Sequence, residues 1–109
     1  MNSTIDIRAS DLKILQDILR NILPKNAKVW VFGSRVKGTV RRASDLDIAI
    51  DVERKLKNKE KSELFHAFEE SDLPYKVDVV DLQNIDENFK KIIDQQKVIL
   101  NFSQKPLSF

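Results

Sequence analysis

Residues 29–50 read VWVFGSRVKGTVRRASDLDIAI, and this stretch decides how the whole chain is interpreted. Gly33 and Ser34 follow a short apolar run, ten residues separate them from Asp45, and Asp47 comes two positions later. Alternate residues of a β-strand point to the same face, so a strand beginning here would place both carboxylates side by side. Neighbouring carboxylates repel each other unless a cation lies between them, and Mg²⁺ prefers oxygen ligands. The stretch therefore predicts a metal site.

The glycine and serine at the end of the apolar run allow two interpretations. Gly33 lacks a Cβ, so backbone N–H groups could approach a phosphate, and Ser34 adds a hydroxyl donor. Glycine also ends strands where no ligand binds, and for a Gly-Ser pair alone this is the more common role. The basic residues between Lys28 and Arg42 could likewise form a solvated loop, or supply a positive field for an anion that carries its own metal.

A third aspartate strengthens the metal hypothesis. Asp78 lies in the apolar run from Tyr75 to Leu82, which predicts a strand, and an uncompensated carboxylate there would be costly. If this strand neighbours that of Asp45 and Asp47, three carboxylates converge. Three aspartates beside a Gly-Ser turn suit two-metal nucleotidyl transfer, which needs neither cysteine nor histidine. The alternative is that Asp45 and Asp47 simply face water at a strand end. Asp81 has the opposite parity to Asp78 and is expected to end the strand or cap a helix.

Composition narrows the possible classes of protein. We expect one domain over residues 1–109, with a loosely held tail from about residue 103. The chain has no cysteine and one histidine, which excludes a thiolate zinc site and a histidine-rich metal site. It has no apolar run of membrane-spanning length and no signal-peptide pattern, which predicts a soluble, cytoplasmic protein. A small open cleft and a formal charge of only +2 together argue against unaided RNA binding, and no direct nucleic-acid binding is expected.

Hydrophobic periodicity predicts the order helix, strand, turn, strand, helix, strand, helix. Ser10 or Asp11 is expected to cap the first helix, which should end near Leu23, and Asn84 is expected to cap the last helix. Phe65 is expected on the buried side of the middle helix. The strands are expected near residues 29–32, 45–51, 75–82 and 98–102, the last as a short edge strand. This order suits an α+β fold, in which helices pack mainly on one face of a small mixed sheet.

The three motifs resemble those of the minimal nucleotidyltransferase (MNT) family, part of the DNA polymerase β-like nucleotidyltransferase superfamily. The matching stretches are residues 33–38, 44–50 and 76–81, and the resemblance covers nearly the whole chain. The superfamily motif is glycine-serine, ten residues and then Asp-x-Asp, with a further aspartate on a later strand. The resemblance implies the polymerase β-like fold.

The resemblance also implies roles for individual residues. Three carboxylates would hold two Mg²⁺ ions, and the third of these carboxylates, that of Asp78, would also help to activate the acceptor. The Gly-Ser turn and the adjoining arginine would hold the triphosphate of ATP. The catalytic and metal-binding residues would be Asp45, Asp47 and Asp78, and the nucleotide-binding residues would be Gly33, Ser34 and Arg35. MNT proteins are often antitoxins encoded beside a HEPN-domain toxin, and some transfer AMP from ATP to a tyrosine of that ribonuclease.

Three functions therefore compete. The preferred one is Mg²⁺-dependent transfer of AMP from ATP to a hydroxyl of a HEPN partner. The second is neutralisation of a HEPN protein by binding alone, in a hetero-oligomer that buries apolar parts of the first or last helix or of the tail at residues 107–109. The third is nucleotidyl transfer to a small molecule or to RNA. Substitution of the aspartates separates the first two, because catalysis would collapse and occlusion would survive.

Overall fold

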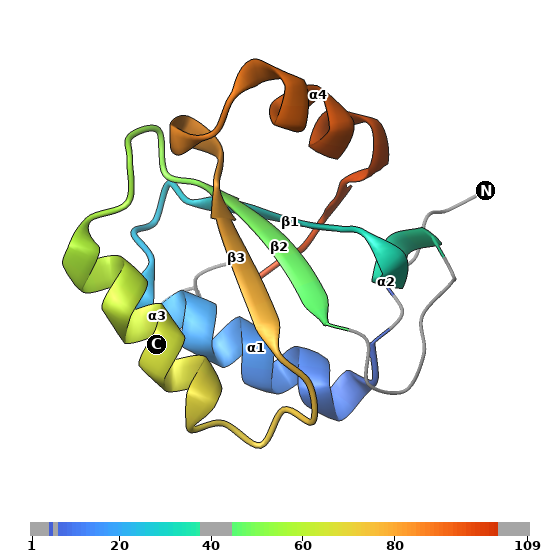
Figure 1. Ribbon diagram of the computed structural model, residues 1–109. Coiled ribbons are helices and arrows are strands. Elements are labelled where there is room, and N and C mark those ends of the chain that lie inside the picture. Colours follow the sequence, from blue (N-terminus) through green and yellow to red (C-terminus); the bar gives the residue numbers. More distant parts are fainter. Residues whose placement is uncertain (1–4, 6, 38–44, 103–109) are drawn as a thin grey trace.

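Four strands form one mixed sheet with the order β3-β2-β1-β4 (Figure 1). The central pair, β1 (Lys28–Phe32) and β2 (Leu46–Asp51), is antiparallel. On the far side of β2, β3 (Val77–Asp81) runs parallel to it, and the two-residue β4 (Val98–Ile99) pairs antiparallel with β1. The structure is a computed structural model, and it describes residue 5 and residues 7–37 and 45–102, with the backbone alone at positions 34 and 37.

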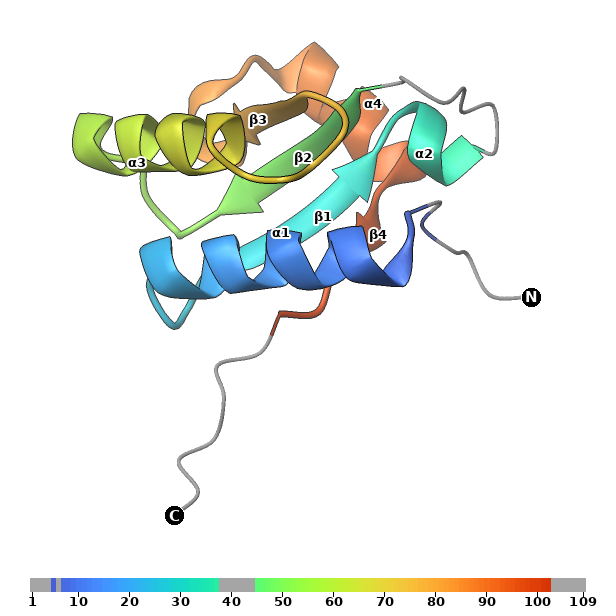
Figure 2. The same ribbon diagram turned by 90° about the horizontal axis from the view of Figure 1, so that it is seen from below.

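Helices cover both faces of this sheet unequally. The longest two, α1 (Ala9–Ile22) and α3 (Asn58–Glu69), pack against each other and cover one face, whereas α4 (Glu87–Gln96) lies on the other (Figures 1 and 2). A single turn, α2 (Ser34–Lys37), follows β1, and the 3₁₀ turn η1 (Leu82–Asn84) joins β3 to α4. The predicted fold class, a small mixed sheet with helices mainly on one face, is confirmed.

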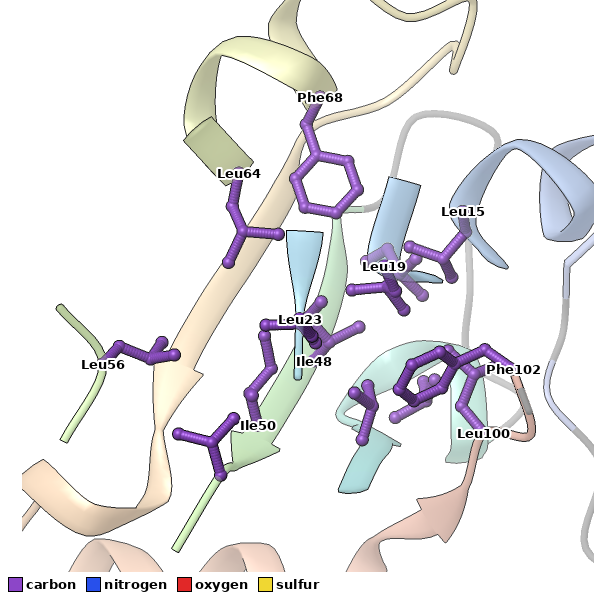
Figure 3. Packing of buried hydrophobic residues seen from close by; sticks show 14 residues of the cluster. Leu15, Leu19, Leu23, Ile48, Ile50, Leu56, Leu64, Phe68, Leu100 and Phe102 are labelled. Carbon is purple, nitrogen blue, oxygen red and sulfur yellow. The ribbon is translucent and has the colours of Figure 1, made fainter. Parts of the chain in front are cut away.

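The main core lies between the sheet and the pair α1 and α3. Leu15 and Leu19 of α1 meet Leu64 of α3 and the strand residues Ile48 and Ile50, all at most 1% exposed (Figure 3). Burial of a side chain of this size contributes roughly 1.5–3 kcal/mol. The alternation in β2 follows from this core, because each apolar residue that faces α1 and α3 turns the next residue to the α4 side.

A smaller apolar cluster occupies the α4 side of the sheet. Its buried members are Phe32, Ala49, Leu82 and Ile93, and Trp30 packs against them half-buried. Asp47 projects from the same face and is only half-buried, and its ladder partner on β1 is Phe32 of this cluster. The main core therefore covers one face of the sheet, and the other face carries polar side chains beside its smaller apolar cluster.

Several local expectations are corrected by the structure. The first helix begins at Ala9, after Arg8, with no side-chain cap, so the prediction of Ser10 or Asp11 as its cap was wrong. The cap of α4 is Asp86, which accepts a hydrogen bond of 2.8 Å from the Phe89 N–H, and Asn84 belongs to η1 instead.

Two further side chains test the sequence pattern. Phe65 was expected in the core and is 59% exposed, because the buried stripe of α3 is confined to Leu64 and Phe68. Asp81 does cap a helical turn, as predicted, since its carboxylate accepts hydrogen bonds from the N–H groups of Gln83 and Leu56. Within the described ranges no helix is long and apolar enough to cross a bilayer.

Candidate functional site

The register between β2 and β3 brings two of the predicted carboxylates together. Asp47 and Asp78 are direct partners in this parallel ladder. Their neighbours Ile48 and Val79 contribute to the main core, so both aspartates project from the opposite face of the sheet. Neighbouring strands lie about 4.8 Å apart, which places the two carboxylates within mutual electrostatic reach. Asp45, exposed and just before β2, has the same parity as Asp47.

The charges of these groups act on one another. Partial burial raises the pKa of the Asp47 carboxyl above its ordinary value, and the negative charges of Asp78 and Asp45 raise it further. A carboxylate that is harder to ionise than normal, and that faces two like charges, is stabilised by any cation that approaches it. Asp47 therefore stands in the negative field of the other two predicted aspartates.

The donor set fits Mg²⁺ in one specific way. Among the residues that the structure describes, no group of three or more acidic or histidine side chains is close enough to form a metal cage by itself. Mg²⁺ is commonly held by one or two carboxylates together with substrate phosphates, so a protein cage is not required. Asp47 with Asp78 or Asp45 could supply the oxygen ligands for that arrangement, and the phosphates of a nucleotide would supply the rest.

A lysine already compensates part of this negative charge. The Nζ of Lys76 lies 3.7 Å from Oδ1 of Asp78, and their side chains are 67% and 43% exposed. Such an exposed ion pair contributes little to stability, on the order of 0–1 kcal/mol. Asp78 can therefore exchange Lys76 for another cation at small cost.

Gly33 is confined between the acidic site and α4. Its φ angle of 84° lies in the left-handed region, where a Cβ is unfavourable, and a Cβ added there would collide with the Asp47 carboxylate. Its N–H donates a hydrogen bond of 2.8 Å to Oε1 of Gln96. Gly33 is thus more than a strand end, because both its conformation and its close approach to Asp47 require glycine. Its own N–H, which was a candidate phosphate donor, is used by Gln96 here.

The other two predicted nucleotide-binding residues are placed differently. Arg35 is only 6% exposed, and its guanidinium carbon lies 3.9 Å from the centroid of the Tyr75 ring. Its predicted contact with the triphosphate stays a prediction. The side chain of Ser34 lies outside the described part of the structure, as do Gly38, the basic residues 41 and 42, Ser44 and the tail from residue 103.

Two residues near the site were not predicted. Gln96 contacts Gly33 across 63 positions of sequence, and Lys97 places its Nζ 4.4 Å from the centroid of the Trp30 ring. Nothing in the local pattern of α4 marks either residue, since both lie in an ordinary polar helix end. Only the position of α4 over β1 brings them to the site.

Comparisons with known proteins bear on the same region. The family model described as Polymerase beta, Nucleotidyltransferase matches residues 13–105, which include all the predicted site residues. A Haemophilus influenzae protein described as a probable protein adenylyltransferase MntA is 41% identical over 101 residues, covering 93% of this chain and 88% of that protein.

Solved structures are similar in fold. A crystal structure of a toxin–antitoxin with AMP-PNP has a chain that is 31% identical with a TM-score of 0.71, covering 86% of this chain and 75% of that one. A second structure, of a tri-AMPylated Shewanella oneidensis HEPN toxin in complex with an MNT antitoxin, has a chain that is 25% identical with a TM-score of 0.67. That match covers 87% of this chain and 72% of the other.

Proposed function

Because the chain belongs to the polymerase beta nucleotidyltransferase family, we propose that it is a protein adenylyltransferase that moves AMP from ATP to a tyrosine of a HEPN toxin. It would act as the antitoxin of that pair. The observation that carries the proposal is the pairing of Asp47 with Asp78 beside the Gly33 turn. The relative named as an adenylyltransferase and the neighbour complex with an AMPylated HEPN toxin support this choice of acceptor.

In this proposal the tyrosine oxygen forms a bond to the α-phosphorus of ATP, the bond from that phosphorus to pyrophosphate breaks, and the hydroxyl proton passes to solvent. Asp45, Asp47 and Asp78 would hold Mg²⁺, which would neutralise the triphosphate and lower the pKa of the attacking hydroxyl. Gly33 leaves room beside Asp47 that a side chain would fill. Asp78 lies on β3, the edge strand beside β2.

ATP is the proposed donor because a similar toxin–antitoxin was crystallised with AMP-PNP, an ATP analogue. Mg²⁺ is the proposed metal because the site offers carboxylate oxygens, which hard cations prefer. The cytoplasm, where ATP and Mg²⁺ are abundant, is the proposed location.

The test is the intact mass of the proposed HEPN partner after incubation with the purified chain, ATP and Mg²⁺. We expect additions of the mass of AMP with the unmodified chain. Asp47→Asn and Asp78→Asn should each reduce the rate at least about a hundredfold, because each removes a charge that acts at the reacting phosphate. Asp51→Asn is the matched control, since Asp51 shares the strand and face of Asp47 but bonds Gln83 and the Glu53 N–H instead.

Neutralisation by binding alone is the second candidate, and it draws on the finding that the described acidic residues form no metal cage by themselves. It would be established if the HEPN protein gained no mass, yet formed a complex that silenced its ribonuclease activity and tolerated both aspartate substitutions. That result would overturn the adenylyltransferase proposal.

A further inference from the structure

The outer edge of β3 is open. In the sheet order β3-β2-β1-β4, the described part of the chain provides no strand on that side of β3. Val77, Asp78, Val79 and Val80 are all half-buried, whereas the corresponding stretch of the inner strand β2 is largely buried. An open edge presents backbone N–H and C=O groups that can pair with another extended chain.

The backbone groups at this edge can be assigned. The N–H of Leu46 donates to the carbonyl of Lys76 at 2.9 Å, so the backbone of Lys76 faces β2. In a parallel ladder, every second residue of a strand directs both its N–H and its C=O to the same neighbouring strand. Asp78 and Val80 therefore also turn their backbone groups to β2, and Val77 and Val79 turn theirs outward. The free edge offers the N–H and C=O of Val77 and Val79.

A groove runs along this edge. It has a volume of about 930 Å³ and lies between α3 on one side and the segment from η1 into α4 on the other. Its walls carry two of the exposed aromatic side chains, Phe65 of α3 at 59% and Phe89 of α4 at 37%. The groove thus combines an unpaired strand edge in its floor with apolar walls, which is the combination that binds extended peptides by strand addition.

Asp78 connects this groove to the acidic site. It lines the groove and is also the ladder partner of Asp47. A residue directly beside Asp78 on an added strand would have its Cβ about 4.5–5.5 Å from that of Asp78, within the reach of a tyrosine side chain. Whatever occupies the groove therefore lies where an acceptor hydroxyl is needed.

We propose that the groove is the acceptor site, in which a tyrosine-bearing segment of the HEPN toxin pairs as an added strand with the outer edge of β3. The inference rests on the proposed function and specifies how its protein substrate is held. The tyrosine stands beside Asp78, and the backbone of the segment bonds to Val77 and Val79. The specificity of the transfer then comes from strand pairing and from the two aromatic walls.

The charges of the groove define the segment further. Two lysines, Lys61 and Lys76, and two carboxylates, Glu69 and Asp78, line it, and a third carboxylate, that of Asp81, is engaged by the N–H groups of Leu56 and Gln83. Lys76 lies beside Asp78, so an acidic residue next to the acceptor tyrosine would find a cation there to pair with. An acidic residue that pairs with Lys76 would also release Asp78 from its contact of 3.7 Å with the lysine.

Hydrogen exchange tests the pairing directly. We expect the amides of Val77 and Val79 to gain protection when the HEPN protein binds the unmodified chain, while the already bonded amides of β2 change little. Absence of added protection at both amides would overturn the acceptor-site proposal whatever the outcome of any substitution.

Substitutions test it through the rate. Val79→Pro removes an outward N–H that takes no part in the β2 ladder, and Val79→Ala removes the same apolar contacts but keeps the N–H. We expect Val79→Pro to lower kcat/KM for the HEPN protein about tenfold relative to Val79→Ala, with KM for ATP unchanged. Phe65→Ser should lower it as well, and Ile99→Ser, which alters a similarly exposed side chain (48%) on the opposite sheet edge, should not.

The two proposals fail in different ways. If the unmodified chain transfers no AMP to the HEPN protein, the proposed function fails. If it transfers AMP, but Val79→Pro and Phe65→Ser match their controls, the groove is not the acceptor site and the proposed function stands. Melting temperatures of all four variants identify any loss of rate that comes from unfolding.

Discussion

Oε1 of Gln96 accepts a 2.8 Å hydrogen bond from the backbone N–H of Gly33, and so ties the end of α4 to the turn beside Asp47. The helix is fixed in this place by its buried residue Ile93 and by Lys97, whose Nζ stands over the Trp30 ring. Gly33 thus has Asp47 on one side and Gln96 on the other, so α4 contacts the turn beside the acidic site without contributing a carboxylate to it.

Gln96→Met should therefore weaken nucleotide binding. The substitution keeps the size of the side chain but leaves the partly buried Gly33 N–H without its acceptor, at a cost of about 1 kcal/mol in unfolding free energy. We expect KM for ATP to rise about fivefold, which corresponds to a similar loss of interaction energy. Gln95→Met is the control, since Gln95 is exposed and one position away. Equal values for the two variants would show that the hydrogen bond does not position the turn.

Gly33→Ala should be strongly destabilising for two separable reasons. A left-handed backbone costs a residue with a Cβ about 1–2 kcal/mol, and the collision with the Asp47 carboxylate adds a cost that calls for repacking, on the order of 1–3 kcal/mol. The double variant Gly33→Ala with Asp47→Ala removes the obstacle and keeps the backbone strain. Urea unfolding of the unmodified chain, the two single variants and the double variant should give a coupling free energy between the two positions of about 1 kcal/mol or more. Additive effects would mean that the glycine is needed for its conformation alone.

The sequence predicted the strands well because a strand depends on short-range pattern, and the site residues are proposed from the same pattern. The period of two in residues 45–50 placed Asp45 and Asp47 on one face, and an aspartate within an apolar run marked Asp78. The sequence predicts that Asp78 lies near Asp47 only if their strands are neighbours in the sheet, and the spacing of the motifs does not determine the strand order. The parallel pairing of β2 with β3 supplies that order.

What the sequence failed to predict depends on tertiary contacts. Gln96 contacts Gly33 only because α4 folds back over β1, and no pattern in the helix itself carries that information. Phe65 reads as a core residue by type, yet the core is already filled at that point by Leu64 and Phe68, so the ring faces the groove. The caps were misassigned for a similar reason. Asp11 near the start of α1 is buried against Tyr75 and Arg8, and Asp86 takes the role expected of Asn84.

Tyr75 should make the protein sensitive to alkali. Its hydroxyl donates to Oδ2 of Asp11 at 3.3 Å, and burial, with the nearby Asp11 charge second, raises its pKa to about 12. The folded state therefore retains this proton above pH 10, where the unfolded chain loses it, so the stability that it contributes falls as pH rises from about 10 to 12.

Tyr75→Phe should lack that fall. Because the ring is only partly buried, we expect the difference to be about 1 kcal/mol and not the full value that the pKa shift would give. Tyr75 is the one tyrosine of the chain, so the absorbance of tyrosinate reports on it alone. A midpoint near pH 10 in the folded protein would contradict the expected burial and its bond to Asp11.

Asp47→Asn should abolish activity and yet stabilise the metal-free protein. The pKa of Asp47 is raised in the folded state, so folding favours its protonated form, and that contribution is lost as pH rises through the folded pKa. At pH 7 the ionised carboxylate therefore costs stability. Removing it should raise Tm measurably in a magnesium-free buffer. The gain should shrink as the pH is lowered through the folded pKa, because the unmodified protein then carries a proton at this site as well.

Magnesium provides the decisive comparison for Asp47. Mg²⁺ should raise the Tm of the unmodified chain, because it binds the folded acidic site, and should leave that of Asp47→Asn nearly unchanged. Asp51→Asn, on the same strand and face, should respond to Mg²⁺ as the unmodified chain does. Calorimetric melts of the three proteins with and without Mg²⁺ give the Tm of each metal-free protein and the rise in Tm that Mg²⁺ causes. If Asp47→Asn melts below the unmodified chain without Mg²⁺, the fold stabilises the ionised carboxylate, and the combined cost of its partial burial and of the repulsion from Asp78 and Asp45 does not dominate.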